Sequence, residues 1–151
     1  MARELMLLFL DFDGVLRRKQ APLYRLEASL VERLAAVLRE YPEVGIVVTS
    51  SWTDAYSLDH IKGLFPSDLA LRILGKTPRV RGDVEHARYR EVLAYLRRSG
   101  MATPWVALDD DPLHYPENAP VVLLDPETGL DAEGVLALKR HFETARTGTM
   151  T

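Results

Sequence analysis

The feature that most constrains the fold is the continuous apolar run LMLLFL at residues 5–10, which ends at Asp11. An uninterrupted run is typical of a strand covered on both faces, as in a parallel sheet, because a half-exposed strand alternates apolar and polar residues. Asp11 and Asp13 follow the run, and Gly14 then permits a sharp turn. Since alternate residues of an extended chain point the same way, both carboxylates can face one site.

Strands and helices alternate along the rest of the chain. The pattern predicts further strands at residues 44–49, 69–74, 105–108 and 120–124, and helices at 26–40, 54–65 (capped by Asp54), 86–98 and 131–145. The alternation predicts an α/β fold of three layers, with a Rossmann-like parallel sheet and helices on both faces. A length of 151 residues suits one domain, 1–151, with residues 145–151 as a frayed polar tail.

Composition excludes several classes of function. The chain contains no cysteine, which rules out disulfides, thiolate zinc sites and cysteine nucleophiles. A net charge of −3 gives no bulk attraction to nucleic acid, although a nucleic-acid end remains open as a substrate. The first apolar run is too short to cross a bilayer and lacks a small-residue cleavage site. We therefore expect a soluble, cytoplasmic protein without a membrane partner.

Polar residues follow three of the predicted strands. They are Asp11 with Asp13 after the first strand, Thr49 with Ser50 after the second, and Asp109 with Asp110 after the fourth. The carboxyl ends of parallel strands meet at one edge of a sheet, where ligands bind in such folds. Clustered carboxylates repel one another, and a hard divalent cation with oxygen ligands relieves that repulsion. The clusters together predict a Mg²⁺ site, although each one alone also fits a turn, a helix cap or a solvated acidic loop.

With these residues the chain resembles the haloacid dehalogenase (HAD) superfamily of phosphohydrolases. The matching segments are LLFLDFDGVL, IVVTS and WVALDD. The stretches from Asp13 to Thr49 and from Thr49 to Arg88 are too short for a cap domain. The resemblance is therefore to the capless HAD domains that occur alone and in bacterial RNA-repair proteins.

The resemblance implies a role for each matching residue. Asp11 would be the nucleophile that forms an aspartyl-phosphate, and Asp13 would protonate the leaving oxygen and then activate water. Thr49, helped by the Ser50 amide, would bind the phosphoryl group. Mg²⁺ would be held by Asp11, Asp109, Asp110 and the backbone carbonyl of Asp13. Gly14, Ser50 and Lys76 are the candidate substrate-binding residues.

The basic residue of the third HAD motif has several candidates, namely Lys76, Arg79, Arg81, Arg88 and Arg90. Arg88 shares a helical stripe with the apolar residues Val92 and Leu96, so it should lean inward near the active edge. We therefore favour Arg88 as the catalytic, positively charged residue of this motif, with Lys76 second. The four histidines lack metal-ligand spacing and receive no role. Trp52 fits either packing or substrate stacking.

The sequence thus predicts a capless, Mg²⁺-dependent phosphomonoesterase with an open site. An open site suits a large phosphorylated substrate such as a nucleic-acid end or a nucleotide. Two alternatives remain open. A metal-dependent nuclease would attack with metal-bound water, and a non-catalytic module on the same fold would only bind phosphate or metal. The oligomeric state is open as well.

Overall fold

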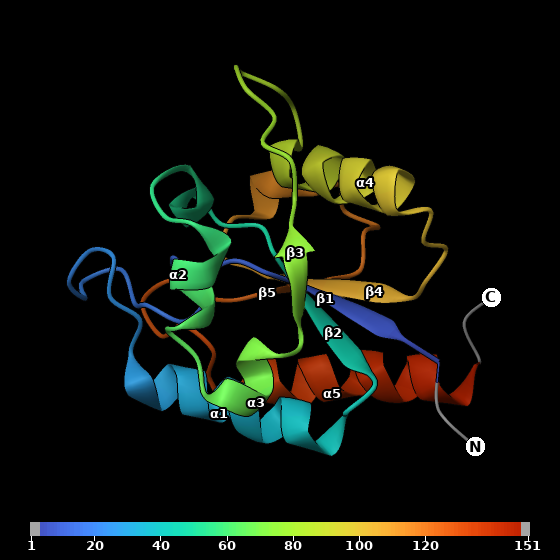
Figure 1. Cartoon of the computed structure of the whole chain (residues 1–151), viewed down its shortest axis with the longest axis horizontal. Helices are drawn as coiled ribbons and strands as arrows, with labels where there is room; N and C mark the ends of the chain where they lie inside the picture. Colours follow the sequence, from blue (N-terminus) through green and yellow to red (C-terminus); the bar gives the residue numbers. More distant parts are fainter. Residues whose placement is uncertain (1–3, 149–151) are drawn as a thin grey trace.

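The computed structural model describes residues 4–148 and is organised around five parallel strands (Figure 1). The strands lie in the order β3-β2-β1-β4-β5, and β1 is central. Leu10, at the end of β1, pairs with Val48 of β2 on one side and with Leu108 of β4 on the other. The carboxyl ends of these three strands are therefore neighbours. The bounds are β1 (Met6–Leu10), β2 (Val44–Val48), β3 (Ile73–Lys76), β4 (Trp105–Asp109) and β5 (Val121–Leu123).

Helices cover both faces of the sheet, as Figure 1 shows, with α1 and α5 on one face and α4 on the other. Leu8 and Leu10 of β1 pack in the core cluster of α1 and α5, whereas Leu7 and Phe9 pack in the cluster of α4. This two-sided burial explains the continuous apolar run and confirms the three-layer α/β prediction. The helices are α1 (Ala28–Glu40), α2 (Leu58–Lys62), α3 (Ser67–Ala70), α4 (Ala87–Ser99) and α5 (Ala132–Thr147), with short 3₁₀ helices η1 (Ser51–Asp54) and η2 (Pro112–His114).

The third strand was predicted too early in the chain. Residues 69–70 complete α3, where Leu69 is buried, and β3 begins only at Ile73. The guanidinium of Arg72 donates to the carbonyl oxygens of Leu38 at 2.7 Å and of Tyr41 at 2.6 Å. These bonds fix the turn that precedes the strand. An apolar run of this length fits a helix as well as a strand, so the sequence pattern alone does not place the start of β3.

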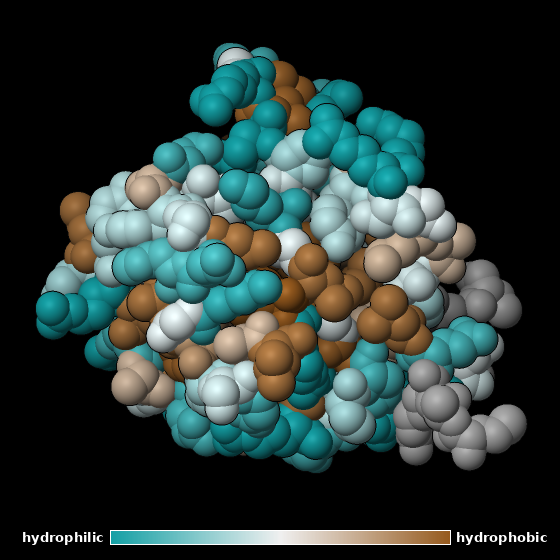
Figure 2. All heavy atoms as spheres, in the orientation of Figure 1, coloured by the Kyte–Doolittle hydropathy of each residue, from teal (hydrophilic) through white to brown (hydrophobic). Residues whose placement is uncertain are grey.

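β3 is an edge strand, and its burial is mixed along its length. Figure 2 shows hydrophobic side chains gathered over the middle of the face on which this edge lies. Leu71 and Leu74 are large apolar residues of this region that remain exposed. Edge strands escape the two-sided burial of central strands, so their sequence pattern is weaker.

Two helix boundaries also differ from the prediction. Asp54 ends η1 and does not cap the next helix. That helix starts at Leu58, where the Ser57 side chain accepts a hydrogen bond from the His60 amide at 3.1 Å. Serine is as good a cap as aspartate, and a turn separates the two segments.

The last helix runs beyond the predicted start of a frayed tail. α5 continues through Thr147, because Arg146 bonds Glu43 at 2.5 Å and lies over the Tyr41 ring at 4.3 Å. The rest of the predicted tail, residues 149–151, lies outside the described residues.

Only short elements follow the first and second motifs. The chain between β1 and β2 carries α1, and the chain between β2 and α4 carries η1, α2, α3 and β3. No cap domain is inserted within residues 4–148. In the same part of the chain, no helix has both the length and the apolar character needed to cross a membrane.

Candidate active site

Two buried carboxylates lie side by side at the carboxyl edge of the sheet. Asp11 follows β1, and its Oδ1 accepts a hydrogen bond from the Phe12 amide at 2.8 Å. Asp109 ends the neighbouring strand β4, and its Oδ1 accepts from the amides of Asp110 at 2.7 Å and Asp111 at 2.9 Å. Backbone donors therefore fix both side chains in place before any ligand binds.

The electrostatics of this pair favour a cation between the carboxylates. Burial, reinforced by the charge of Asp109, raises the pKa of Asp11 to about 8. Burial and Asp109 likewise raise the pKa of Asp110 to about 6. A divalent cation would offset both causes, since it replaces lost solvation and separates like charges. The donor set of this edge therefore fits a hard metal ion.

His114 joins the carboxylates, although the sequence analysis assigned it no role. One ligand atom from each of Asp11, Asp109 and His114 lies within 4.8 Å of the others. His114 Nδ1 lies 3.0 Å from Asp109 Oδ2, and its Nε2 lies 3.5 Å from Asp111 Oδ2. Burial opposes protonation of His114, but its hydrogen bond to Asp109 raises its pKa overall. With a carboxylate at each ring nitrogen, His114 orients Asp109 better than it would bind a metal.

The loop before His114 explains why the sequence pattern missed it. Asp111 caps η2 by accepting a hydrogen bond from the Leu113 amide at 2.9 Å, and Pro112 occupies the first position of the turn. This turn folds the chain back so that His114 faces the acids. The signal in the sequence was the combination of an Asx cap and a proline directly after the acids.

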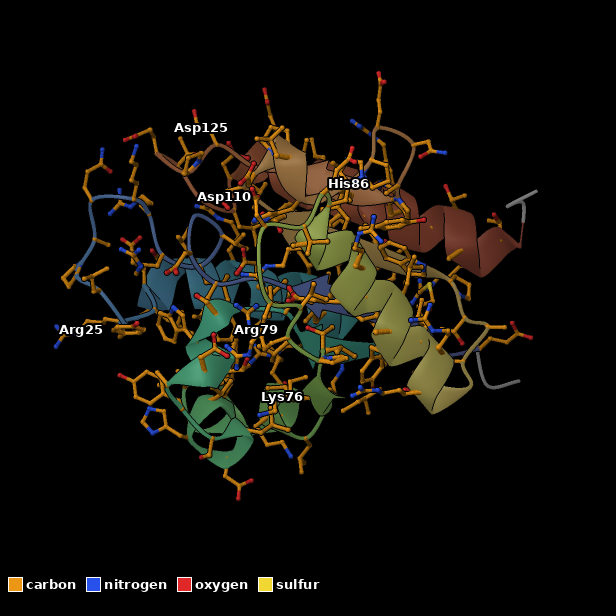
Figure 3. All side chains as sticks on the ribbon, turned by 90° about the horizontal axis from the view of Figure 1, so that it is seen from above. Arg25, Lys76, Arg79, His86, Asp110 and Asp125 are labelled. Carbon is orange, nitrogen blue, oxygen red and sulfur yellow. The ribbon has the colours of Figure 1, made fainter. Side chains whose placement is uncertain are left out.

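Arg88 is the basic residue that the fold brings to the carboxylates. It lies in the first turn of α4. Burial lowers the pKa of Arg88, but Asp11, the hydrogen bond to Glu91 and Asp109 together raise it overall. Its Nε is buried and has no hydrogen-bond partner among residues 4–148. Lys76 is exposed at the end of β3, and in Figure 3 it lies apart from Asp110. The arrangement therefore offers Arg88, with a free donor, to a ligand of the acidic pair.

Glu91, which the sequence analysis did not single out, holds Arg88 in position. Its carboxylate is only 1% exposed and accepts from Arg88 Nη1 at 2.9 Å. It also accepts from the Val80 amide at 2.9 Å and from Arg79 Nη1 at 3.3 Å. Glu91 thus ties the loop between β3 and α4 to the helix start. The Arg-to-Glu spacing of three on one helix was the available signal.

Two threonine hydroxyls lie buried at strand ends without partners. Thr49 follows β2 and donates its amide to the Leu10 carbonyl at 2.9 Å, and Thr77 follows β3 and donates to the Val48 carbonyl at 2.9 Å. Within the described residues, neither Oγ1 makes a hydrogen bond. A buried hydroxyl without a partner is unfavourable, so such groups commonly await a ligand or water. Thr77 was missed because it reads as part of a loop.

Ser50 is placed differently from its neighbour Thr49. Its side chain accepts from the Trp52 amide at 3.1 Å and so caps η1. The hydroxyl oxygen is used to cap η1, whereas the backbone amide of Ser50 donates no hydrogen bond within the described part of the chain.

Asp13 and Gly14 form the turn beside the pair. The Asp13 carboxylate is 42% exposed, and its Oδ1 accepts from Arg17 Nε at 2.8 Å and Trp52 Nε1 at 3.2 Å. Gly14 has a φ of +76°, and a Cβ there would lie 2.2 Å from Asp110 Oδ2. Glycine is therefore required where the turn approaches Asp110. The Gly14 amide donates to the Arg17 carbonyl at 2.8 Å, so it is not free for a ligand. Gly14 contributes by letting the backbone pass close to the Asp110 side chain.

An apolar cavity of about 270 Å³ lies elsewhere. It is lined by residues that include Leu7, Trp105 and Phe142. Leu7 and Trp105 lie near the starts of β1 and β4, so the cavity opens at the amino end of the sheet. It contains none of the acids, and the polar site at the carboxyl edge is the better candidate for chemistry.

The fold and the order of these groups together define a HAD-like domain. An acid pair follows β1, a threonine follows β2, a basic residue begins α4, and paired acids close β4. The family described as the HAD domain in Swiss Army Knife RNA repair proteins matches residues 7–135, and the chain belongs to this family. Searches of curated proteins and of solved structures found no match.

Proposed function

We propose that the protein is a Mg²⁺-dependent phosphohydrolase that removes a terminal phosphate from a nucleic-acid end through an aspartyl-phosphate. The observation that carries the proposal is the buried Asp11–Asp109 pair, with Arg88 beside it and an unpartnered Thr49 hydroxyl at the neighbouring strand end. The family's connection with RNA repair supports the nucleic-acid end as substrate.

The acids fit Mg²⁺ as the resident metal. The carboxylates of Asp11, Asp109 and Asp110 and the main-chain carbonyl of Asp13 would hold it, since this ion takes oxygen ligands and keeps several waters. His114 would act as the donor that fixes Asp109. When bound, the ion neutralises the clustered carboxylates and the oxygens of the phosphoryl group.

The chain's own groups then account for two chemical steps. In the first, a carboxylate oxygen of Asp11 attacks phosphorus, the bond to the leaving oxygen breaks, and Asp13 gives its proton to that oxygen. In the second, Asp13 takes a proton from water, whose oxygen attacks phosphorus and releases inorganic phosphate and free Asp11. Arg88, the Thr49 hydroxyl and the Ser50 amide would stabilise the charged phosphoryl oxygens in both steps.

The contacts of Asp13 suit this double role. Arg17 and Trp52 both donate to Oδ1, so Oδ2 stays free for proton transfer in a carboxylate that is 42% exposed. Two donors on one oxygen also fix the orientation of the group, which proton transfer requires. Lys76, exposed at the end of β3, would contact the substrate beyond the phosphoryl group.

The test is hydrolysis of an aryl phosphate and of phosphate-terminated oligonucleotides, with Mg²⁺ or with EDTA. We expect metal-dependent phosphate release by the wild type and none by Asp11→Asn. Asp59→Asn, which changes an exposed carboxyl of α2, is the matched control and should keep full activity. Full activity of Asp11→Asn would refute the nucleophile. Cleavage of internal phosphodiester bonds by that variant would instead identify a metal-dependent nuclease.

A further inference from the structure

A cluster of aromatic side chains extends from the candidate general acid to the protein surface. We call Tyr24, Trp52, Tyr56 and His60 the aromatic rim. Trp52 Nε1 donates to Asp13 Oδ1 at 3.2 Å, and the Trp52 indole is buried. The Tyr24 ring lies 5.5 Å from Trp52 and 5.6 Å from Tyr56. His60 stacks on Tyr56 at 4.5 Å with an interplanar angle of 14°. The rim therefore begins at the reacting groups and ends in solvent.

The outer part of the rim is not explained by the core. Tyr24 is 54% exposed, and the neighbouring Leu23 is 75% exposed. Tyr24 also has a φ of +56°, a left-handed conformation that is unfavourable for a tyrosine. Exposed apolar surface held in a strained backbone next to an active site commonly serves binding.

The loop that carries Tyr24 is basic. Lys19 and Arg25 are exposed and make no ion pair with any residue in the range 4–148, whereas Arg18 is paired with Glu27 at 2.7 Å. In Figure 3, Arg25 lies at the outer end of this loop, well away from Asp110. The acids thus lie at the sheet edge, and the two unpaired cations lie on the loop that carries the exposed Tyr24, with Arg25 directly after it in the chain.

We propose that the aromatic rim stacks the bases next to the terminal phosphate of a single-stranded oligonucleotide, while Lys19 and Arg25 contact its backbone. The identity of the bound phosphate rests on the proposed function. Aromatic faces and unpaired cations on the same loop match the bases and phosphates of a single strand. Every base offers a π-face, so such a platform binds without regard to sequence, as a site that acts on chain ends requires.

The position of Trp52 links this surface to the chemistry. Because the same indole contacts Asp13 and the Tyr24 ring, a base on Tyr24 lies close to the group that protonates the leaving oxygen. The rim would thus position the last nucleotides of the strand, and the acids would act on the phosphate. A small aryl phosphate reaches the acids without using Tyr24.

The test measures binding by fluorescence anisotropy in EDTA, which prevents turnover. The probes are labelled RNA and DNA strands of one sequence, each carrying a terminal phosphate. Tyr24→Asn removes the ring but keeps a residue type that tolerates a positive φ. We expect this variant to bind both strands roughly 5- to 150-fold more weakly, the loss of one stacked base. Tyr24→Phe should bind as the wild type does, and so should Leu136→Ala, an exposed residue of α5.

A second variant and a second substrate keep the two proposals separable. Arg25→Ala should weaken binding and reduce its dependence on salt concentration. Aryl phosphate hydrolysis by Tyr24→Asn with Mg²⁺ should stay within about twofold of the wild type, because this small substrate carries no base and reaches the acids without using Tyr24. A change within that limit is well below the loss of one stacked base. A weaker affinity for RNA alone would narrow the ligand to RNA. Equal oligonucleotide affinity of folded Tyr24→Asn and wild type would overturn the rim, whatever the hydrolysis result. Hydrolysis by Asp11→Asn tests the proposed function alone, and its loss would not restore the aromatic rim if Tyr24→Asn binds oligonucleotides as the wild type does.

Discussion

Replacing Glu91 by glutamine should destabilise the protein strongly, although the two side chains have nearly the same shape. Glu91 is 1% exposed, and its carboxylate accepts hydrogen bonds from two arginines and one backbone amide. Removing one member of a buried ion pair costs about 3–5 kcal/mol, because it leaves the other charge uncompensated. Arg79 keeps a second partner in Asp54 at 3.3 Å, so we expect the lower end of that range, about 3 kcal/mol.

Urea unfolding measures this loss directly, as a lower midpoint at an unchanged slope. For a chain of this size the same loss lowers the melting temperature by roughly 6–12 °C. Glu32→Gln is the matched control, since Glu32 is 64% exposed in its ion pair with Arg39 and should change stability by less than about 1 kcal/mol. Equal stabilities of the two variants would refute the view that Glu91 anchors the start of α4.

Three further predictions concern the metal, the pH dependence and the core. Mg²⁺ at about 100 times its Kd should raise the free energy of unfolding by about 2.7 kcal/mol in the wild type, measured by urea titration, and have no effect in Asp109→Asn. Gly14→Ala should abolish that stabilisation too, because the new Cβ displaces Asp110. Burial lowers the pKa of His141 below its unfolded value, so the contribution of His141 to stability should fall as pH drops through about 6.5. The free energy of unfolding of His141→Gln relative to the wild type should therefore be higher at pH 5.5 than at pH 7.5, as measured by urea unfolding curves at the two values. Leu34→Ala, at a fully buried position of α1, should cost about 2–5 kcal/mol in urea unfolding.

The central strands could be predicted because burial on both faces requires an uninterrupted run of apolar residues. β1 and β2 are buried at every position, and each ends at a polar residue that marks the edge of the sheet. β3 carries no such signal, since it is an edge strand with alternating exposure and follows a buried helical leucine. The strand positions were therefore predicted most accurately where helices cover both faces of the sheet.

The candidate site divides along similar lines. Asp11, Asp109 and Arg88 could be located because strand ends and a helical stripe fix their directions. His114 and Glu91 could not be located, because a capped turn positions the first and a loop supplies a partner of the second. Neither arrangement produces a regular spacing in the sequence. The exposed Tyr24 belongs to the same group, since only the folded loop brings its ring against Trp52.

The central claim is that Asp11 becomes covalently phosphorylated. The most direct measurement is a rapid acid quench of the protein with a radiolabelled aryl phosphate and Mg²⁺, followed by counting of protein-bound label. Asp13→Ala should retain label, because an aryl leaving group needs little protonation while release of the phosphoryl group needs the base. Asp11→Asn should retain none. Turnover by the wild type with no bound label in either the wild type or Asp13→Ala would contradict the account and indicate direct attack by water.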